Sequence, residues 1–117
     1  MGKTAVISVD GHVKASRSEY REYISEKYQE AFDAEVKAAE EAGIPDAGNL
    51  HPELDPEVQW DSDRRLENLE AVGVVAEVLF PNGQPFQINR LDDYPHAASA
   101  ELAEAGRQAF NRWLADF

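Results

Sequence analysis

Two short runs of apolar residues along the chain are typical of buried β-strands. The first is Ala5 to Val9, closed by Asp10 and Gly11, and the second is Val74 to Phe80, closed by Pro81 to Gly83. Both are rich in β-branched residues and show little alternation of polar and apolar positions, which is typical of parallel strands covered on both faces. We therefore expect two central parallel strands, each ending in a turn.

Apolar residues four positions apart predict an amphipathic helix after the first strand. Ser16 and Glu19 have the spacing of a capping box, and the helix extends from Ser18 to Ala42, where Gly43 and Pro45 end it. Its apolar stripe is typical of a face packed in a core, although a partner-binding face has the same pattern. The stripe consists of Tyr20, Ile24, Tyr28, Phe32 and Val36.

Two further helices are predicted, from Arg64 to Val72 and from Ala97 to Phe117. The first has an N-cap at Asp61 to Asp63 and a left-handed cap at Gly73. Gly43 to Trp60 is rich in Pro, Gly, Asn and Asp and predicts a long irregular loop, which in a compact domain is usually functional or mobile. The resulting order is a βαβα unit whose parallel strands are joined by a right-handed crossover.

Composition restricts the classes of partner. The 117 residues suit one domain, and the formal net charge of -12 argues against nucleic acid and anionic membrane surfaces as partners. The absence of cysteine excludes disulfides, thiolate catalysis and cysteine metal sites. The first apolar run is too short for a signal-peptide core, so we expect a cytoplasmic protein.

Asp10 and His12 are the first candidates for chemistry. They follow the first strand, and residues two apart on an extended segment point to the same side, so a carboxylate and an imidazole can converge on one divalent ion. The alternative is that Asp10 and Gly11 form an ordinary turn and His12 is a polar loop residue. His51 and Glu53, in the long loop, are a weaker candidate pair for a metal, and we favour a solvated loop because nothing in the sequence fixes their geometry.

The segment that follows the second strand contains the candidate substrate contacts. Asn82 and Gln84 are hydrogen-bonding groups, and Phe86 is suited to lining a pocket. Turn chemistry alone explains Pro81 to Gly83. Arg64 and Arg65 are expected to form surface ion pairs with nearby acidic residues.

Three segments together resemble a known family. They are Val6 to Val13, Arg64 to Asn82 and Phe110 to Phe117, and they are similar to the opening strand, the first-helix and second-strand segment, and the helix before the third strand of the amidohydrolase-related family. That group includes the aminocarboxymuconate-semialdehyde decarboxylase type. Many relatives have His-x-His in the first strand, whereas here Asp10 stands in place of the first His and His12 matches the second.

The resemblance implies a distorted (β/α)8 barrel with one divalent metal, zinc or manganese, bound in part by Asp10 and His12. It implies hydrolysis of C–N or C–O bonds, or decarboxylation of a small organic acid without an organic cofactor. A complete barrel of this type needs about 250 residues. We therefore interpret residues 1–117 as a single partial domain, the N-terminal βαβα portion of such a barrel, with the family's later metal ligands on segments beyond this sequence.

Two strands alone make an inadequate sheet, because both edges are open. The chain is therefore expected to be inactive by itself and to associate with the missing barrel portion or with a second copy. The alternative is a non-enzymatic assembly or binding module that covers the same edges with a partner. Hydrolysis and decarboxylation are not distinguished by these residues.

Overall fold

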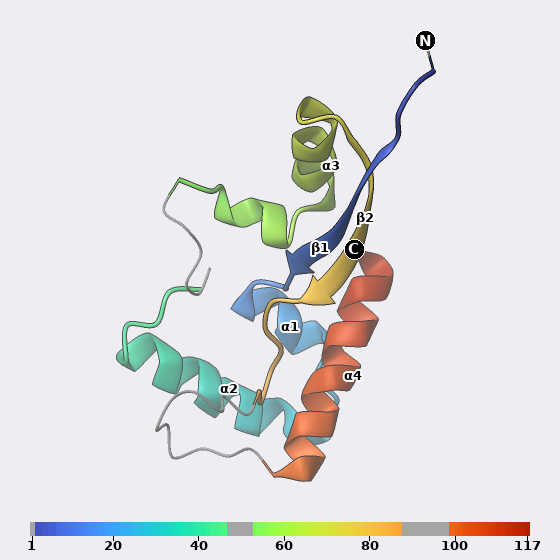
Figure 1. The fold of residues 1–117 in the computed structure, drawn as a ribbon. Helices are drawn as coiled ribbons and strands as arrows, with labels where there is room; N and C mark the ends of the chain where they lie inside the picture. The colour runs from blue at the N-terminus through green and yellow to red at the C-terminus, as the bar shows by residue number, and fades with distance from the viewer. Residues whose placement is uncertain (1, 47–52, 88–98) are drawn as a thin grey trace.

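The computed structural model describes residues 2–46, 53–87 and 99–117 and shows a mixed α/β architecture (Figure 1). Its two strands pair in parallel, as predicted. The helices that flank the strands lie close to their predicted positions. In chain order the elements are β1 (Val6–Val13), α1 (Arg17–Tyr23), α2 (Glu26–Glu41), the 3-10 helix η1 (Pro56–Gln59), α3 (Ser62–Ala71), β2 (Val74–Pro81) and α4 (Ala100–Asp116).

The first strand is longer than its sequence predicts. It continues through Asp10 and Gly11 to Val13, and the register becomes irregular between Ser8 and Gly11, although His12 again pairs with Phe80. The predicted turn at Asp10 and Gly11 is therefore wrong. The irregularity is a local shift in strand pairing, so Asp10 and Gly11 stay within the strand and the chain does not change direction there.

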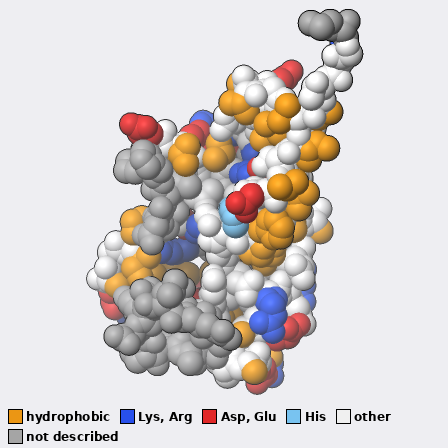
Figure 2. Space-filling model, viewed as in Figure 1, with side chains coloured by type: hydrophobic (Ala, Val, Ile, Leu, Met, Phe, Trp, Pro, Cys, Tyr) orange, Lys and Arg blue, Asp and Glu red, His pale blue; other side chains and the backbone are white. Residues whose placement is uncertain are grey.

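The expectation that both strands are buried is also wrong for this chain. Val9 is 69% exposed and Val75 is 67% exposed, and four more apolar side chains of the strands are similarly open. For Ile7, Val78 and Phe80 the physical reason is that α3 packs against β2 on the other face of the sheet, while no helix of the described residues makes a comparable contact on theirs. Val75 lies on the α3 face, in a groove that α3 fills only in part. Figure 2 shows the resulting strip of hydrophobic side chains along the strands.

The single long helix predicted after β1 is divided into α1 and α2. Ile24 adopts an extended conformation between them, and Ser25 precedes α2 as its N-cap. The break lets Ile24 point into the core, where it is 3% exposed. Burial of this side chain by tertiary packing outweighs the local preference for continuing the helix.

The capping predictions are confirmed. The carboxylate of Glu19 accepts hydrogen bonds from the Ser16 backbone nitrogen at 3.0 Å and from its hydroxyl at 2.8 Å. The carboxylate of Asp61 accepts from the Arg64 nitrogen at 3.0 Å. Gly73 has the positive φ of 77° that favours glycine after a helix.

The hydrophobic core lies beyond the carboxyl ends of the strands, where α1, α2 and α4 meet (Figure 1). The predicted stripe is there: Tyr20, Ile24 and Phe32 are buried, and Tyr28 and Val36 pack against them. Trp113 of α4 is 3% exposed and packs edge-on against Tyr20, with ring centroids 6.1 Å apart. The core-packing interpretation of the stripe is confirmed.

The Cα radius of gyration is 16.0 Å. A compact domain of this length has a radius of gyration of about 13 Å, so the molecule is extended. The strands contribute to this shape because they reach away from the helical core (Figure 1). Among the described helices, none combines the length and the apolar character needed to cross a membrane.

Candidate functional site

Asp10 and His12 lie side by side on β1. The Nε2 atom of His12 is 3.0 Å from Oδ1 of Asp10, and both side chains reach solvent, at 46% and 85% exposure respectively. This convergence is the one predicted from their spacing on an extended segment. The two groups are therefore open to a ligand from solution.

The uncovered face of the sheet carries this pair. His12 pairs with Phe80 in the register, and the centroids of their rings are 6.1 Å apart, which places both rings on one face. Glu77 and Leu79, which alternate with Phe80, face the groove beside α3 instead. The Asp10–His12 pair thus lies opposite the face on which α3 packs.

The separation of the two donor atoms suits a shared metal ion. Two ligands at about 2.0–2.1 Å from a tetrahedral zinc lie about 3.3 Å apart, close to the observed 3.0 Å. The contact is a hydrogen bond between the two side chains, and a metal ion would replace it, because only an unprotonated imidazole nitrogen ligates a metal. Residues 2–46, 53–87 and 99–117 contain no cluster of three or more His, Cys, Asp or Glu side chains suited to a metal ion. The pair would fill two positions of a coordination sphere.

Asn82 closes the end of the sheet. Its backbone nitrogen donates to the Val13 carbonyl at 2.7 Å, and its side-chain amide donates to Oε1 of Gln59. Gln84 is half-buried, and its backbone nitrogen lies 3.4 Å from Oε1 of Gln87. In the described part of the chain, neither Asn82 nor Gln84 forms a hydrogen bond with the Asp10–His12 pair.

Phe86 is part of the core. It is 4% exposed and meets Phe32 edge-on, with ring centroids 6.2 Å apart. Its backbone nitrogen donates to the Glu35 carboxylate at 3.1 and 3.2 Å. Loss of hydration raises the pKa of Glu35, and the hydrogen bond from Phe86 opposes this effect. The structure therefore shows a packing role for Phe86, and its place in a substrate pocket stays a prediction.

The weaker metal pair is only partly visible. Glu53 lies at the surface, whereas His51 falls outside the described residues. Their predicted convergence is not addressed by the described structure.

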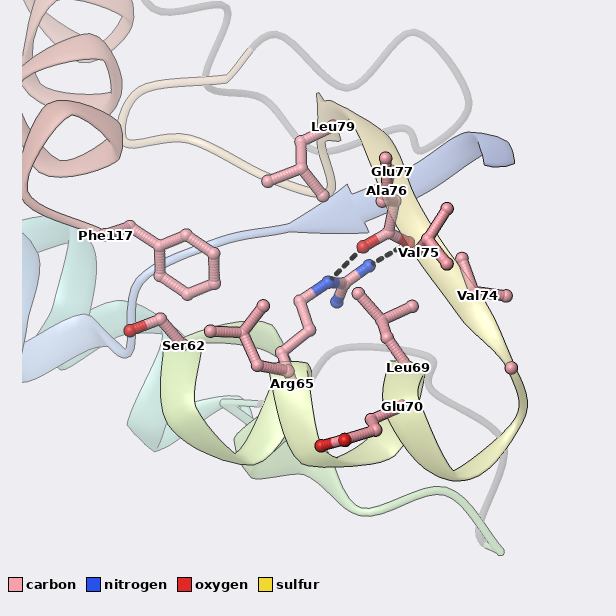
Figure 3. A pocket seen from close by; sticks show the side chains of 12 residues that line it. Ser62, Arg65, Leu69, Glu70, Val74, Val75, Ala76, Glu77, Leu79 and Phe117 are labelled. Atoms are coloured by element: carbon pink, nitrogen blue, oxygen red, sulfur yellow. Dashed lines mark hydrogen bonds and ion pairs between the residues drawn. The ribbon is translucent and has the colours of Figure 1, made fainter. Parts of the chain in front are cut away.

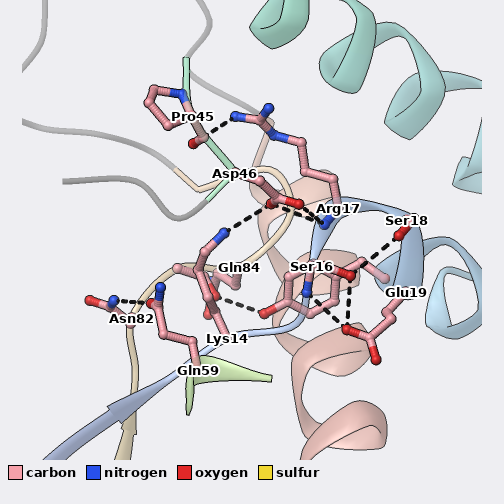
Figure 4. Close-up of polar contacts among 12 residues, drawn as sticks. Lys14, Ser16, Arg17, Ser18, Glu19, Pro45, Asp46, Gln59, Asn82 and Gln84 are labelled. Atoms are coloured by element: carbon pink, nitrogen blue, oxygen red, sulfur yellow. Dashed lines mark hydrogen bonds and ion pairs between the residues drawn. The ribbon is translucent and has the colours of Figure 1, made fainter. Parts of the chain in front are cut away.

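Gln59 is a structural residue that the sequence pattern does not reveal. It is 1% exposed, its carbonyl accepts from the Lys14 nitrogen at 3.1 Å, and its side chain accepts from Asn82 (Figure 4). It therefore ties the segments that follow β1 and β2 to each other. A glutamine in a proline-rich loop carries no sequence signal for burial, so only tertiary structure identifies this role.

A second polar cluster holds the start of α1. The Asp46 carboxylate accepts hydrogen bonds from the Arg17 nitrogen at 3.1 and 3.2 Å and from Nζ of Lys14 at 3.4 Å (Figure 4). Burial lowers the pKa of Lys14, and the charge of Asp46 acts in the opposite direction. These contacts connect the segment after α2 to the segment after β1.

Arg64 and Arg65 differ in environment. Arg64 pairs at the surface with Asp55 at 2.9 Å and with Glu57 at 2.8 Å, as predicted. The prediction is wrong for Arg65, whose side chain is 13% exposed and pairs with Glu77, which is 10% exposed. Helix α3 places Arg65 toward the sheet, and two adjacent arginines on a helix cannot share one face.

The Arg65–Glu77 pair lies in a groove of about 600 Å³ between α3 and β2 (Figure 3). Both bonds of the pair, Nε to Oε2 and Nη2 to Oε1, are 2.7 Å long. Apolar side chains surround it, among them Leu69, Val75 and Phe117. The groove is thus an apolar channel with a neutralised ion pair inside it.

Comparisons with protein-family models, with curated proteins and with solved structures found no match.

Proposed function

We propose that this chain supplies the first two strands of a metal-dependent barrel of the amidohydrolase type. In this proposal Asp10 and His12 are two of the ligands of one divalent ion, zinc or manganese. The observation that carries it is the 3.0 Å approach of Nε2 of His12 to Oδ1 of Asp10. A carboxylate and an imidazole side by side on a strand form a common part of such metal sites.

The position of the pair supports the same proposal. In a (β/α)8 barrel the helices surround the outer face of the strands, and functional groups gather at the carboxyl ends of the strands. Here α3 packs on one face of the sheet, while His12 lies on the other face, in the second half of β1. The uncovered face corresponds to the barrel interior, which would explain why its apolar side chains are exposed in this chain.

The chemistry proposed is that of a metal-assisted hydrolase or carboxy-lyase. The ion would activate water for attack on a C–N or C–O bond, or hold the carboxylate of a small organic acid during decarboxylation. Asn82 and Gln84, which follow β2 at the same end of the sheet, are proposed substrate contacts. The remaining ligands would come from segments beyond this chain, so residues 1–117 alone should show no turnover.

The proposal is tested by metal titration followed by NMR. We expect zinc or manganese to perturb the ring signals of His12 at a weak affinity, since the described residues offer only two ligands. Asp10→Ala should abolish the perturbation of the His12 ring, and His12→Ala should abolish the shift that the metal causes in the backbone amide signal of Asp10. Glu30→Ala, which removes an exposed carboxylate from α2, is the matched control and should leave both responses unchanged. An undiminished metal response in both site variants would overturn the metal assignment.

A second function rests on a different observation. The exposure of Ile7, Val78 and Phe80 on one face of the sheet, at 57%, 47% and 45%, suits a module that assembles with a partner. We propose this non-enzymatic role as the alternative. Metal titration separates the two, because both functions are compatible with association through the apolar face, whereas only the metal-dependent barrel requires an ion to bind at Asp10 and His12.

A further inference from the structure

The backbone carbonyl of His12 accepts a hydrogen bond from Arg65, whose side chain lies on the face of the sheet opposite the His12 ring. Nη1 of Arg65 donates to the His12 carbonyl at 3.2 Å and to the Val58 carbonyl at 2.9 Å. The other side of the same guanidinium carries the two bonds to Glu77. One side chain of α3 therefore connects β1, β2 and η1.

Gly11 is what allows this arrangement. A Cβ atom on Gly11 would overlap the Glu77 carboxylate, which occupies the space directly over the peptide between Asp10 and His12. The carboxylate has little freedom to move aside, because both of its oxygens are bonded to Arg65. The presence of glycine in the Asp-Gly-His triplet is thus explained by the position of the Glu77 carboxylate, which leaves no space for a side chain, and not by a turn.

The rigidity of the contact follows from its chemistry. The planar guanidinium presents its donors in a fixed fork, so the bidentate bond to Glu77 also fixes the direction of the bond to the His12 carbonyl. With both side chains at most 13% exposed, water competes little for the two bonds between Arg65 and Glu77. Partners that hydrogen-bond directly to metal-ligating side chains typically change metal affinity about 10–100-fold when removed, and Arg65, which bonds to the His12 backbone, is expected at the lower end of that range.

We propose that Arg65 and Glu77 are positioning residues for the Asp10–His12 site. They hold the His12 backbone so that its ring stays beside Asp10 and Phe80 on the other face of the sheet. The metal-binding part of this inference rests on the proposed function, whereas the positioning part can be measured without metal.

The experiment compares Arg65→Met with Arg64→Met in the full 117-residue chain. The first arm, without metal, records the NMR contacts between the His12 ring and the Phe80 ring and the carbonyl carbon shift of His12. Arg65→Met should weaken the ring contact and shift the carbonyl signal, while Arg64→Met, which loses only surface pairs, should change neither. The second arm titrates zinc, and Arg65→Met should weaken zinc binding at His12 by about tenfold.

Each outcome has a definite meaning. Unchanged His12 signals in folded Arg65→Met overturn the positioning role, whatever zinc does. If zinc causes no change in the His12 signals of the wild-type chain, the proposed function is overturned. The first arm, recorded without metal, then decides the positioning role by itself. Should Arg65→Met fail to fold, Glu77→Gln keeps the shape of the side chain while removing its charge, and it should shift the same His12 signals. Partial recovery of those signals in Arg65→Lys supports positioning, because lysine keeps a donor but loses the fork.

Discussion

The carbonyl of Pro85 occupies the space that a side chain on Gly106 would need. Alanine at an interior helix position is normally about 1 kcal/mol more favourable than glycine. Gly106→Ala should reverse that sign, because the added Cβ would push the loop before Phe86 away from α4. We expect a loss of about 1–3 kcal/mol in the free energy of unfolding, typical of overpacking.

Denaturant unfolding measures this change, and Asn111→Ala provides the control. Asn111 is an exposed residue of the same helix, so its replacement should be neutral or slightly stabilising. A Gly106→Ala variant as stable as the wild-type chain would mean that Pro85 does not approach α4 this closely.

The hydroxyl of Tyr20 donates to the Gly83 carbonyl at 2.8 Å, and the residue is 5% exposed. Tyr20→Phe keeps the ring in the core but leaves the Gly83 carbonyl without this donor. We expect a cost of about 1–2 kcal/mol in the free energy of unfolding. Tyr28→Phe removes a hydroxyl that bonds to the exposed carboxylate of Glu101 and should cost less, because water replaces that partner.

The raised pKa of Tyr20 predicts that the free energy of unfolding depends on pH. Burial raises its pKa, so the folded chain keeps the phenol proton above the pH of about 10 at which an unfolded tyrosine loses it. The stability contributed by Tyr20 is therefore complete below that pH and is lost as the pH rises toward the folded-state pKa. The difference in free energy of unfolding between wild type and Tyr20→Phe should shrink above pH 10. Taking the difference cancels the opposite contribution of Lys14, whose pKa is lowered by burial.

Val78 and Leu79 are neighbours that face opposite sides of β2. Val78 is 47% exposed, whereas Leu79 packs against the core. Val78→Lys should reduce hydrophobic-dye binding and self-association with less than about 0.5 kcal/mol change in stability. Leu79→Lys should instead destabilise the fold. Dye fluorescence and sedimentation velocity test this pair, and unchanged association in Val78→Lys would show that another surface drives it.

Local pattern predicted much of this fold. Both strands, their parallel pairing, the stripe through Tyr20 and Phe32, and the cap at Asp61 follow from periodicity and capping chemistry. The approach of Asp10 to His12 follows from their spacing on an extended segment. Apart from the pairing of the strands, which follows from the connection rule for a βαβ unit, each of these features depends mainly on residues close together in the sequence.

The features that sequence alone did not reveal depend on distant residues. Ile24 interrupts the helix, and its side chain is buried by packing against distant residues of the core. Gln59 is buried where Lys14 and Asn82, from the segments that follow the two strands, donate hydrogen bonds to it. Arg65 differs from Arg64 because only one of two adjacent helix positions faces Glu77. Whether helices cover one face or both faces of the sheet could not be predicted, because the same β-branched runs occur in both cases.

The parallel ladder between Val6–Val13 and Val74–Pro81 has a consequence for how the chain folds. Its hydrogen bonds join segments separated by most of the chain, so the entropy of closing a long loop must be lost before any of them forms. The helices need only neighbouring residues. We therefore expect refolding to proceed with early helix formation and late strand pairing, at a rate limited by chain topology and not by the strength of the final contacts.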